Sequence, residues 1–216
     1  MASAETIIRE LTVNDLTAVA TVHLAAFPKS ALTALGKEAV RRYYEWLLVG
    51  PHDGAALAAF SENQLAGFCF SGIFRGAMSG FLNRNRFYLM VRVMTHPWLL
   101  FNPLFRDRLA TGWRVLRRLS KPKPAQVTAT PPPAAPRAFG ILAIAVNPAV
   151  QGKGAGKLLM LAAERIARQR NFELMDLSVS TENKQAIDFY ERLHWRKVLK
   201  NGVWAGEMIK SLNENN

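Results

Sequence analysis

The first third of the chain changes between the hydrophobic periods of strands and of helices. A β-compatible run over 6–11 predicts a first strand. Apolar residues then recur at helical spacing over 14–27 and over 32–48, which predicts two helices. Two further β-compatible runs, 55–61 and 65–73, are separated by a short polar link. This spacing predicts that the two runs pair as a hairpin.

The last third of the chain has the clearest pattern. Residues 139–146 carry no polar side chain, as expected of a strand that is covered on both faces. An amphipathic helix is predicted over 154–169, with Glu164 on its polar side. A strand, a short helix and a closing hairpin complete the pattern, over 174–180, 183–193, 195–199 and 203–209.

The order of these elements predicts the fold class. Strands that alternate with helices, some of them joined as hairpins, indicate an α/β fold with a mixed sheet covered by helices on both faces. We expect one domain over 1–216. Residues 74–120 are basic and aromatic, and they predict a helical insert between the third and fourth strands, broken near Pro97 and Pro103. The connector that follows, 121–137, holds six of the eleven prolines and is expected to be extended.

The composition indicates a folded domain that meets acidic partners. Half of the 216 residues are apolar, so the chain can bury a core and is not expected to be disordered. Lysine and arginine number 28 against 16 acidic residues, a formal net charge of +12. This charge favours nucleotides, phosphorylated small molecules, nucleic acid or anionic lipid as partners, and does not choose among them.

Cysteine, histidine and the longest apolar run argue against several classes of protein. Cys69 is the only cysteine, so no internal disulfide is possible, and with no secretory signature we expect a reducing, cytoplasmic location. The four histidines lack the spacing of a metal site, so we expect no metal. Residues 87–105 are apolar, but Arg92 and two prolines interrupt them, which argues against a membrane-spanning helix.

A glycine-rich turn joins the apolar strand to the amphipathic helix. Glycines allow a tight turn and a close ligand, and the first N–H groups of a helix carry partial positive charge, so such a turn suits a pyrophosphate. The P-loop motif fails at Gln151 and Leu158, and the dinucleotide motif fails at Lys157. The alternative stays open that the glycines only make the start of the helix flexible and that the turn binds no ligand. The turn comprises Gln151, Gly152, Lys153, Gly154, Ala155, Gly156 and Lys157.

Two motifs, in this order along the chain, resemble one family of enzymes. The first has the pattern Gln/Arg-x-x-Gly-x-Gly/Ala, with Gln151, Gly154 and Gly156 at its fixed positions. It resembles the acetyl-CoA-binding motif of the GNAT superfamily of N-acetyltransferases. The second resembles that family's Asn-x-x-Ala-x-x-Phe-Tyr helix, with Asn183, Ala186, Phe189 and Tyr190. The family's Gly-Phe after this helix is replaced by His194 and Trp195, and the resemblance covers 138–209.

The resemblance implies a mostly antiparallel, GNAT-like sheet and direct transfer of an acetyl group from acetyl-CoA, the co-substrate, to a primary amine. Residues 151–157 would hold the pyrophosphate. Backbone groups of Ile144 and Val146 would meet the acetyl carbonyl and the pantetheine arm, because in the family this strand diverges from the next one. Tyr190 would protonate the departing thiolate, or else simply pack on the apolar face of its helix. Asn183 would contact the cofactor or only cap the helix.

The general base is not evident from the sequence. His23, Glu45 and Asp53 are candidates, as is a water molecule held by Ser178 or Ser180. Each of these residues is more often structural in such a setting, and a lone histidine on the core face of a helix usually packs there. We therefore assign none of them as the base.

The basic insert leaves the acceptor open. By the resemblance, 27–35 and 74–120 would shape the pocket for a small-molecule amine, for example an anionic acceptor or an amino sugar. The simplest interpretation of the insert is an amphipathic helix packed over this pocket. Contact with a membrane surface is a further interpretation, and nucleic acid is the less expected partner. The sequence predicts no oligomeric state.

Two other functions stay open at this point. A non-catalytic acyl-CoA-binding protein, whose insert binds nucleic acid or a membrane, would explain why no base is evident. An enzyme with a longer acyl-CoA as donor would be consistent with the small side chains of Ala143 and Ala145 near the acyl end.

Overall fold

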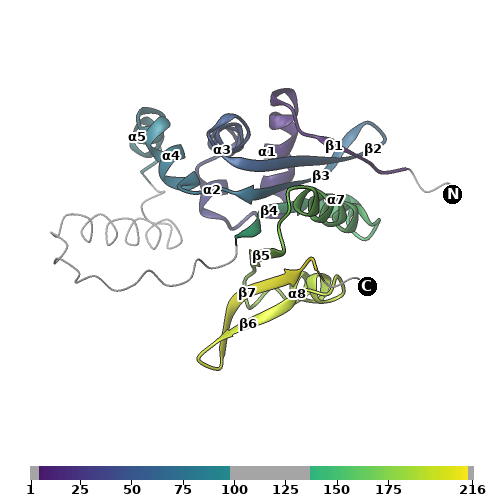
Figure 1. Cartoon of the computed structure of the whole chain (residues 1–216). Helices are drawn as coiled ribbons and strands as arrows, with labels where there is room; N and C mark the ends of the chain where they lie inside the picture. Colours follow the sequence, from purple (N-terminus) through teal and green to yellow (C-terminus); the bar gives the residue numbers. More distant parts are fainter. Residues whose placement is uncertain (1–4, 98–136, 214–216) are drawn as a thin grey trace, which may run out of the picture.

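The computed structural model of the chain describes residues 5–97 and 137–213. Its strands form one seven-stranded sheet in the order β1-β2-β3-β4-β5-β7-β6 (Figure 1). Neighbouring strands are antiparallel except β4 and β5, which are parallel. The predicted mixed, mostly antiparallel sheet is therefore confirmed. The strands are β1 (Ile7–Glu10), β2 (Asp53–Ser61), β3 (Gln64–Ile73), β4 (Ala138–Val146), β5 (Leu174–Ser178), β6 (Arg196–Lys200) and β7 (Val203–Ser211).

Helices cover both faces of this sheet, as predicted (Figure 1). On one face, α1 and α3 bury an aromatic core around Tyr44 and Phe68. On the other face, α7 and α8 bury a second core around Leu159 and Met175. The helical elements are η1 (Val13–Asp15), α1 (Leu16–Ala26), α2 (Ala31–Ala34), α3 (Lys37–Val49), α4 (Ala77–Arg84), α5 (Arg86–Thr95), η3 (Pro148–Val150), α7 (Ala155–Gln169) and α8 (Lys184–Glu191).

The two predicted hairpins are confirmed, and each turns on two residues in the left-handed region. Glu62 and Asn63 join β2 to β3 with φ values of 50° and 60°. Asn201 and Gly202 join β6 to β7 with φ values of 52° and 77°. Two consecutive residues with positive φ give the turn whose twist matches that of the paired strands.

The helix predicted over 32–48 is wrong in one respect, because the chain breaks it into α2 and α3. Gly36 stands at the break with φ of 92°, a conformation that a helix cannot contain. The Ser30 hydroxyl accepts a hydrogen bond from the Thr33 amide and starts α2 separately. The apolar positions keep helical spacing across the break, so the pattern alone did not reveal it.

Two predictions about burial also need correction. Glu164 does not lie on a solvated face of α7: its side chain is buried, and Lys210 on β7 donates to its carboxylate at 2.7 Å. A buried carboxylate is retained only when it is paired in this way. The strand β4 is not covered on both faces throughout, because Leu142 at its centre is 40% exposed.

The start of the predicted insert is helical where the structure describes it. After β3, α4 and α5 follow with a short break at Asn85, and α5 ends before Pro97. The predicted break near Pro103 and the connector 121–137 lie, apart from Arg137, outside the described residues. No helix in 5–97 or 137–213 is long and apolar enough to cross a membrane.

Candidate active site

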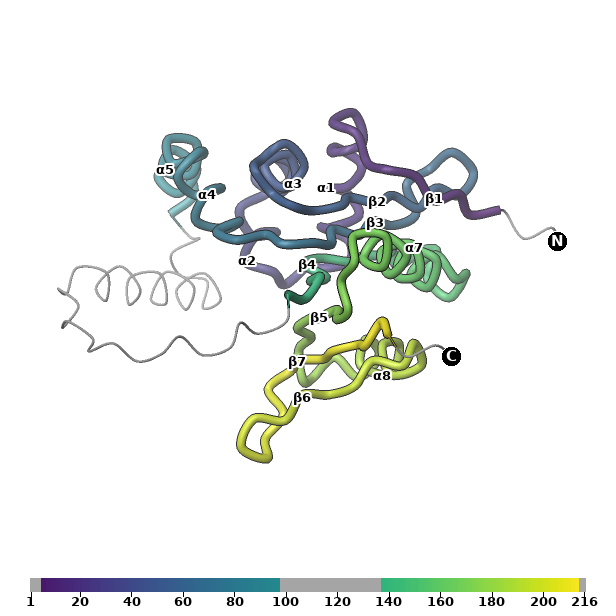
Figure 2. The backbone as a smooth tube through the Cα atoms, in the orientation of Figure 1, coloured from purple at the N-terminus to yellow at the C-terminus, as the bar shows by residue number. Residues whose placement is uncertain are grey.

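The sheet opens between its two parallel strands. β4 pairs with β5 only over its first half, from Ala138 opposite Leu174 to Ile141 opposite Leu177. Beyond Ile141 the two strands diverge, and the described residues supply no strand partner for this edge of β4 up to Val146 (Figure 2). Backbone amides and carbonyls on an unpaired edge are free to bind a ligand. The divergence of the two strands that the resemblance implied is therefore present.

A β-bulge at Leu142 sets which side chains of β4 face which core. On β3, Phe70 pairs with Ala143 and Ser71 pairs with Ile141, so Leu142 has no partner across this pair. Ahead of the bulge, Ile141 packs in the core beneath α7; after it, Ile144 packs there instead. Because one extra residue reverses the alternation, the even-numbered residues of the second half point toward α7.

The same reversal places the two small side chains that had suggested a longer acyl donor. Ala143 and Ala145 pack with the core of α1 and α3, and Ala145 is buried there. They line the face of β4 opposite to α7, next to the aromatic core of that face.

The glycine-rich turn lies directly after β4 and forms an open loop. The side-chain amide of Gln151 donates to the carbonyl of Val146 at 3.1 Å, which holds the loop against the end of the strand. Gly152 and Gly154 have φ values of 81° and 88°. A Cβ added at either glycine would meet no atom of the described residues within 4 Å, so the space above the loop is open.

The turn ends at the N-terminus of α7, which no protein side chain caps. Gly154 is the N-cap residue and has no side chain to accept from the first-turn amides. Lys153 and Lys157 are exposed beside it. A Cβ added at Gly156 would come within 3.4 Å of the Phe189 ring, so this glycine lets α7 approach α8 closely. The exposed amides and the partial positive charge of the helix start suit an anion.

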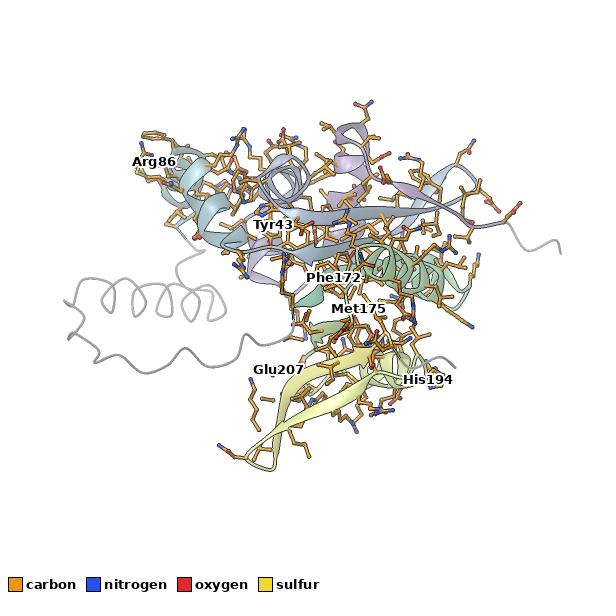
Figure 3. All side chains as sticks on the ribbon, viewed as in Figure 1. Tyr43, Arg86, Phe172, Met175, His194 and Glu207 are labelled. Atoms are coloured by element: carbon orange, nitrogen blue, oxygen red, sulfur yellow. The ribbon has the colours of Figure 1, made fainter. Side chains whose placement is uncertain are left out.

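The helix α8 is positioned by its own cap. Asn183 accepts a hydrogen bond from the Ala186 amide at 3.1 Å, so the capping role considered for Asn183 is present. After α8, His194 adopts φ of 64°, the region that the family's glycine suits best, and lies at the end of the molecule near α8 (Figure 3). Trp195 is buried and packs against the ring of Tyr190, with 6.1 Å between centroids.

Tyr190 lies in the core beneath the open part of the sheet. It is 8% exposed and belongs to the same buried cluster as Cys69 and Leu177, with Ile144 packed against that cluster. Burial, and to a lesser extent the nearby Cys69, raise the pKa of Tyr190 above its ordinary value. Its hydroxyl forms no hydrogen bond to another described residue. The phenol is therefore protonated at neutral pH and has its proton available.

The three candidate bases considered from the sequence are all engaged elsewhere. His23 is buried, with Nδ1 2.8 Å from the Tyr44 hydroxyl. Glu45 forms an ion pair with Arg41 at 3.2 Å. Asp53 lies 3.1 Å from Arg170. These partners give each residue a structural role.

Burial makes His23 an acid-sensitive position. Burial lowers its pKa to about 4, so the unfolded state takes up this proton first as the pH falls. The neutral His23 side chain therefore contributes to the free energy of unfolding above its ordinary pKa of about 6.5, and this contribution is lost as the pH falls toward 4. It amounts to about 3 kcal/mol. In His23→Gln, the free energy of unfolding in urea should fall less between neutral and mildly acidic pH. The control is His194→Asn, an exposed histidine, which should keep the wild-type fall; equal falls in both variants would contradict this role.

One carboxylate that sequence analysis did not consider lies on the paired part of β5, one residue before the point where β4 and β5 diverge. Asp176 lies on β5 between the buried Met175 and Leu177, so it points away from the α7 core. Its carboxyl would lie 3.1 Å from a Cβ added at its partner, Gly140 on β4. Partial burial, and more weakly Glu207, raise the pKa of Asp176. A carboxylate with a raised pKa could accept a proton from an amine, and the alternation along β5 was the signal that could have found it.

No group of three or more metal-ligating side chains comes together within 5–97 and 137–213. The candidate site comprises the uncapped backbone amides of α7, the exposed Lys153 and Lys157 beside them, and the buried phenol of Tyr190. A family model described as the acetyltransferase (GNAT) family matches residues 17–195. This chain belongs to the GNAT acetyltransferase family.

Solved structures agree with this assignment at the level of the fold. PH1933 from Pyrococcus horikoshii OT3 is 17% identical with a TM-score of 0.57, covering 97% of this chain and 100% of that one. The ribosomal-protein-S18-alanine N-acetyltransferase from Escherichia coli is 14% identical with a TM-score of 0.55, covering 98% and 97%. The PaiA N-acetyltransferase from Thermoplasma acidophilum, in complex with coenzyme A, is 15% identical with a TM-score of 0.54, covering 96% and 99%. No curated protein matches the chain significantly.

Proposed function

We propose that this GNAT protein transfers an acetyl group from acetyl-CoA directly to a primary amine of an acceptor molecule. The observation that carries the proposal is the junction of two unpaired backbone surfaces. The free edge of β4 after Ile141 runs into the uncapped N-terminus of α7 at Gly154. One surface suits the amide-rich pantetheine arm, and the other suits the diphosphate that the arm carries.

The proposal assigns the cofactor to this region of the protein. Backbone groups of Ile144 and Val146 bind the acetyl carbonyl and the pantetheine arm. Amides of the turn bind the diphosphate, with two lysines adding charge. The binding segment comprises Gln151, Gly152, Lys153, Gly154, Ala155, Gly156 and Lys157. Asn183 caps the N-terminus of α8, the helix whose Phe189 packs beside Gly156, and contacts the cofactor from there.

The chemical step needs the neutral amine to attack the thioester carbonyl. A backbone N–H of the β4 edge stabilises the negative charge that develops on the carbonyl oxygen. The carbon–sulfur bond then breaks, and the Tyr190 hydroxyl gives its proton to the departing thiolate. The attacking nitrogen loses one proton, which returns through water to the Tyr190 oxygen, so the products are the amide, free coenzyme A and the restored phenol. The raised pKa of Tyr190 keeps that proton in place until the thiolate forms.

Relatives support the choice of donor. The Thermoplasma acidophilum protein was solved with coenzyme A, and a GNAT family acetyltransferase from Brucella melitensis was solved with acetyl-CoA. The second protein is 14% identical to this chain, with a TM-score of 0.52. The proposal carries this ligand class over to the open edge of β4.

Acetyl-CoA should raise the melting temperature of the protein. A ligand that binds only the folded state at one hundred times its Kd adds about 2.7 kcal/mol, which is about 5–10 °C for a chain of this size. Pantetheine, which lacks the diphosphate, is the matched control and should give a clearly smaller shift. If millimolar acetyl-CoA leaves the melting temperature unchanged, the proposal is wrong.

Turnover separates the proposed enzyme from a non-catalytic acyl-CoA-binding protein. Thiol release from acetyl-CoA, followed with a panel of amines, should show acetyl transfer to at least one of them. A melting shift without transfer to any amine would favour binding alone. Longer acyl-CoA donors in the same assay test the chain length that the site accepts.

A further inference from the structure

The outer side of α5 presents an apolar stripe to solvent. No residue of this helix is buried. Four large apolar side chains recur at helical spacing on its outer side and are 54–74% exposed. These residues, here called the α5 stripe, are Phe87, Met90, Val91 and Met94. Single exposed apolar residues are ordinary, but a contiguous exposed stripe marks an interaction surface.

The opposite side of α5 is held to the rest of the protein by an arginine side chain and by apolar packing. Arg92 donates from Nε to the Leu35 carbonyl at 3.1 Å. Tyr88 and Leu89 pack against the small cluster of Leu35 and Ala39. The helix therefore packs Tyr88, Leu89 and the Arg92 guanidinium against the protein and still presents an apolar stripe to solvent, where a helix on a water-exposed surface carries polar side chains.

The segment that carries the stripe is basic. Residues 74–97 contain four arginines and no aspartate or glutamate. Arg86 lies at the outer edge of α5, with its guanidinium 4.8 Å from the centre of the Phe87 ring (Figure 3). A phosphate group approaching Phe87 would therefore meet this guanidinium directly.

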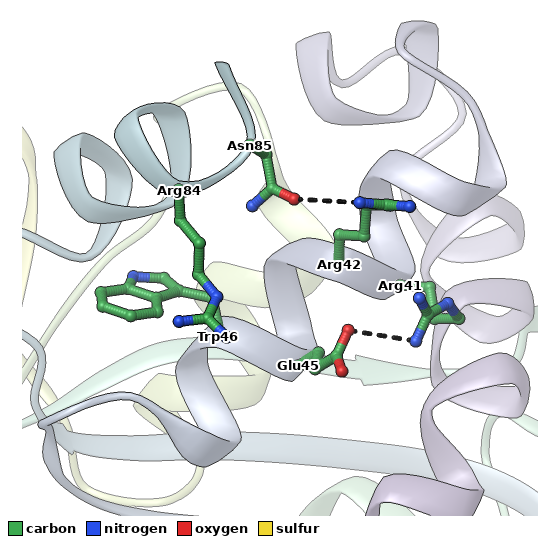
Figure 4. Close-up of a pocket in the computed structure, with 6 residues that line it drawn as sticks. All are labelled: Arg41, Arg42, Glu45, Trp46, Arg84 and Asn85. Atoms are coloured by element: carbon green, nitrogen blue, oxygen red, sulfur yellow. Dashed lines mark hydrogen bonds and ion pairs between the residues drawn. The ribbon is translucent and has the colours of Figure 1, made fainter. Parts of the chain in front are cut away.

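Arg84 has no carboxylate partner among the described residues. Figure 4 shows the pocket between α3 and α4, where Glu45 is paired with Arg41 at 3.2 Å. In the same pocket, Arg42 lies 3.4 Å from the Asn85 amide oxygen. Arg84 instead lies over Trp46, with 5.8 Å from its guanidinium carbon to the ring centroid. Its charge is thus not neutralised by the nearby acidic side chain.

We propose that the α5 stripe docks this protein on the surface of an anionic phospholipid bilayer. Phe87 and the methionines enter the boundary between headgroups and acyl chains, and Arg84 and Arg86 meet lipid phosphates. A bilayer satisfies both the apolar stripe and the arginines, whereas nucleic acid satisfies only the charge. A second copy would place this arginine-rich face against itself. Residues 98–123 carry seven more basic residues against a single aspartate, so their charge repels this face as well.

Vesicle sedimentation of the full chain tests this docking. The protein should sediment with vesicles of two parts phosphatidylcholine to one part phosphatidylglycerol, and not with phosphatidylcholine alone. High salt should weaken the association. The triple variant Phe87→Ser, Met90→Ser, Met94→Ser should bind the mixed vesicles about tenfold more weakly or worse, because it removes the inserted apolar surface.

The matched control changes three equally exposed apolar residues elsewhere. Ile7→Ser, Leu199→Ser, Val203→Ser alters side chains that are 61%, 62% and 67% exposed on the strands. This variant should bind vesicles like the wild type, and both triple variants should keep their acetyl-CoA-induced melting shift. Failure of the wild type to bind, or equal binding by both triple variants, would overturn the proposal. Loss of self-association or of duplex DNA binding in the α5 variant, with vesicle binding unchanged, would overturn it too.

Discussion

Replacement of Tyr190 by phenylalanine is expected to lower kcat for acetyl transfer by about 100- to 1,000-fold, the usual contribution of a general acid. The Kd for acetyl-CoA should change by no more than about twofold, because a proton donor acts on the transition state and not on cofactor binding. The phenol ring fills a buried position between Phe189 and Trp195, and phenylalanine keeps that packing. Single-turnover rates and acetyl-CoA titrations of the purified variant measure the two quantities.

The matched control for this variant is Tyr43→Phe. Tyr43 is also 8% exposed, and burial raises its pKa as well, but it lies on α3 in the core of the other face. Its loss should leave kcat within about twofold of the wild type, since it touches neither reacting group. Equal losses in the two variants would point to a general effect of packing. An unchanged rate in Tyr190→Phe would assign proton donation to another group.

Gly154→Val is expected to raise the Kd for acetyl-CoA by about tenfold or more. Gly154 has φ of 88°, which a β-branched residue adopts only with strain of about 1–3 kcal/mol. The turn would relax, and the first amides of α7 would leave the positions in which they bind the diphosphate. A tenfold change corresponds to about 1.4 kcal/mol of binding free energy. Titration of acetyl-CoA, followed by calorimetry, gives this value.

The chain offers a control with the same backbone strain at a distant turn. Gly202 has φ of 77°, and a Cβ added there also meets no described atom within 4 Å. Gly202→Val should lower the melting temperature about as much as Gly154→Val does, while its Kd for acetyl-CoA stays at the wild-type value. If Gly202→Val weakens the binding of acetyl-CoA to the same extent as Gly154→Val, the higher Kd comes from lost stability and not from the turn after β4.

Features that depend on neighbouring residues were predictable from the sequence. The turn from Gln151 to Lys157 was visible because glycines at fixed spacing stand between an apolar strand and an amphipathic helix. The Asn201-Gly202 hairpin was visible for the same reason, since these two residues favour positive φ. The cap at Asn183 likewise needs only the three residues that follow it.

Features that depend on distant partners were not predictable. Glu164 has the position of a solvated residue on α7, and only the tertiary approach of Lys210 explains its burial. The break at Gly36 is compensated by contacts between α2, α3 and α5 that helical spacing does not report. The alternation along β5 indicates the face on which Asp176 lies, but its place opposite Gly140 depends on the pairing of β5 with β4. In the first two cases, long-range contacts overrode the local pattern.

The inserted residue Leu142 has a consequence for how this strand can change over time. Deleting that one residue would remove the bulge and leave the other side chains of β4 on their present faces. Regular pairing with Leu142 retained would instead exchange Ala143 and Ala145 with Ile144 and Val146 between the two hydrophobic layers. Bulky side chains would then collide with the aromatic layer under α1, while gaps would open beneath α7. The order of side chains along β4 therefore fits both layers only while the extra residue stays in a bulge.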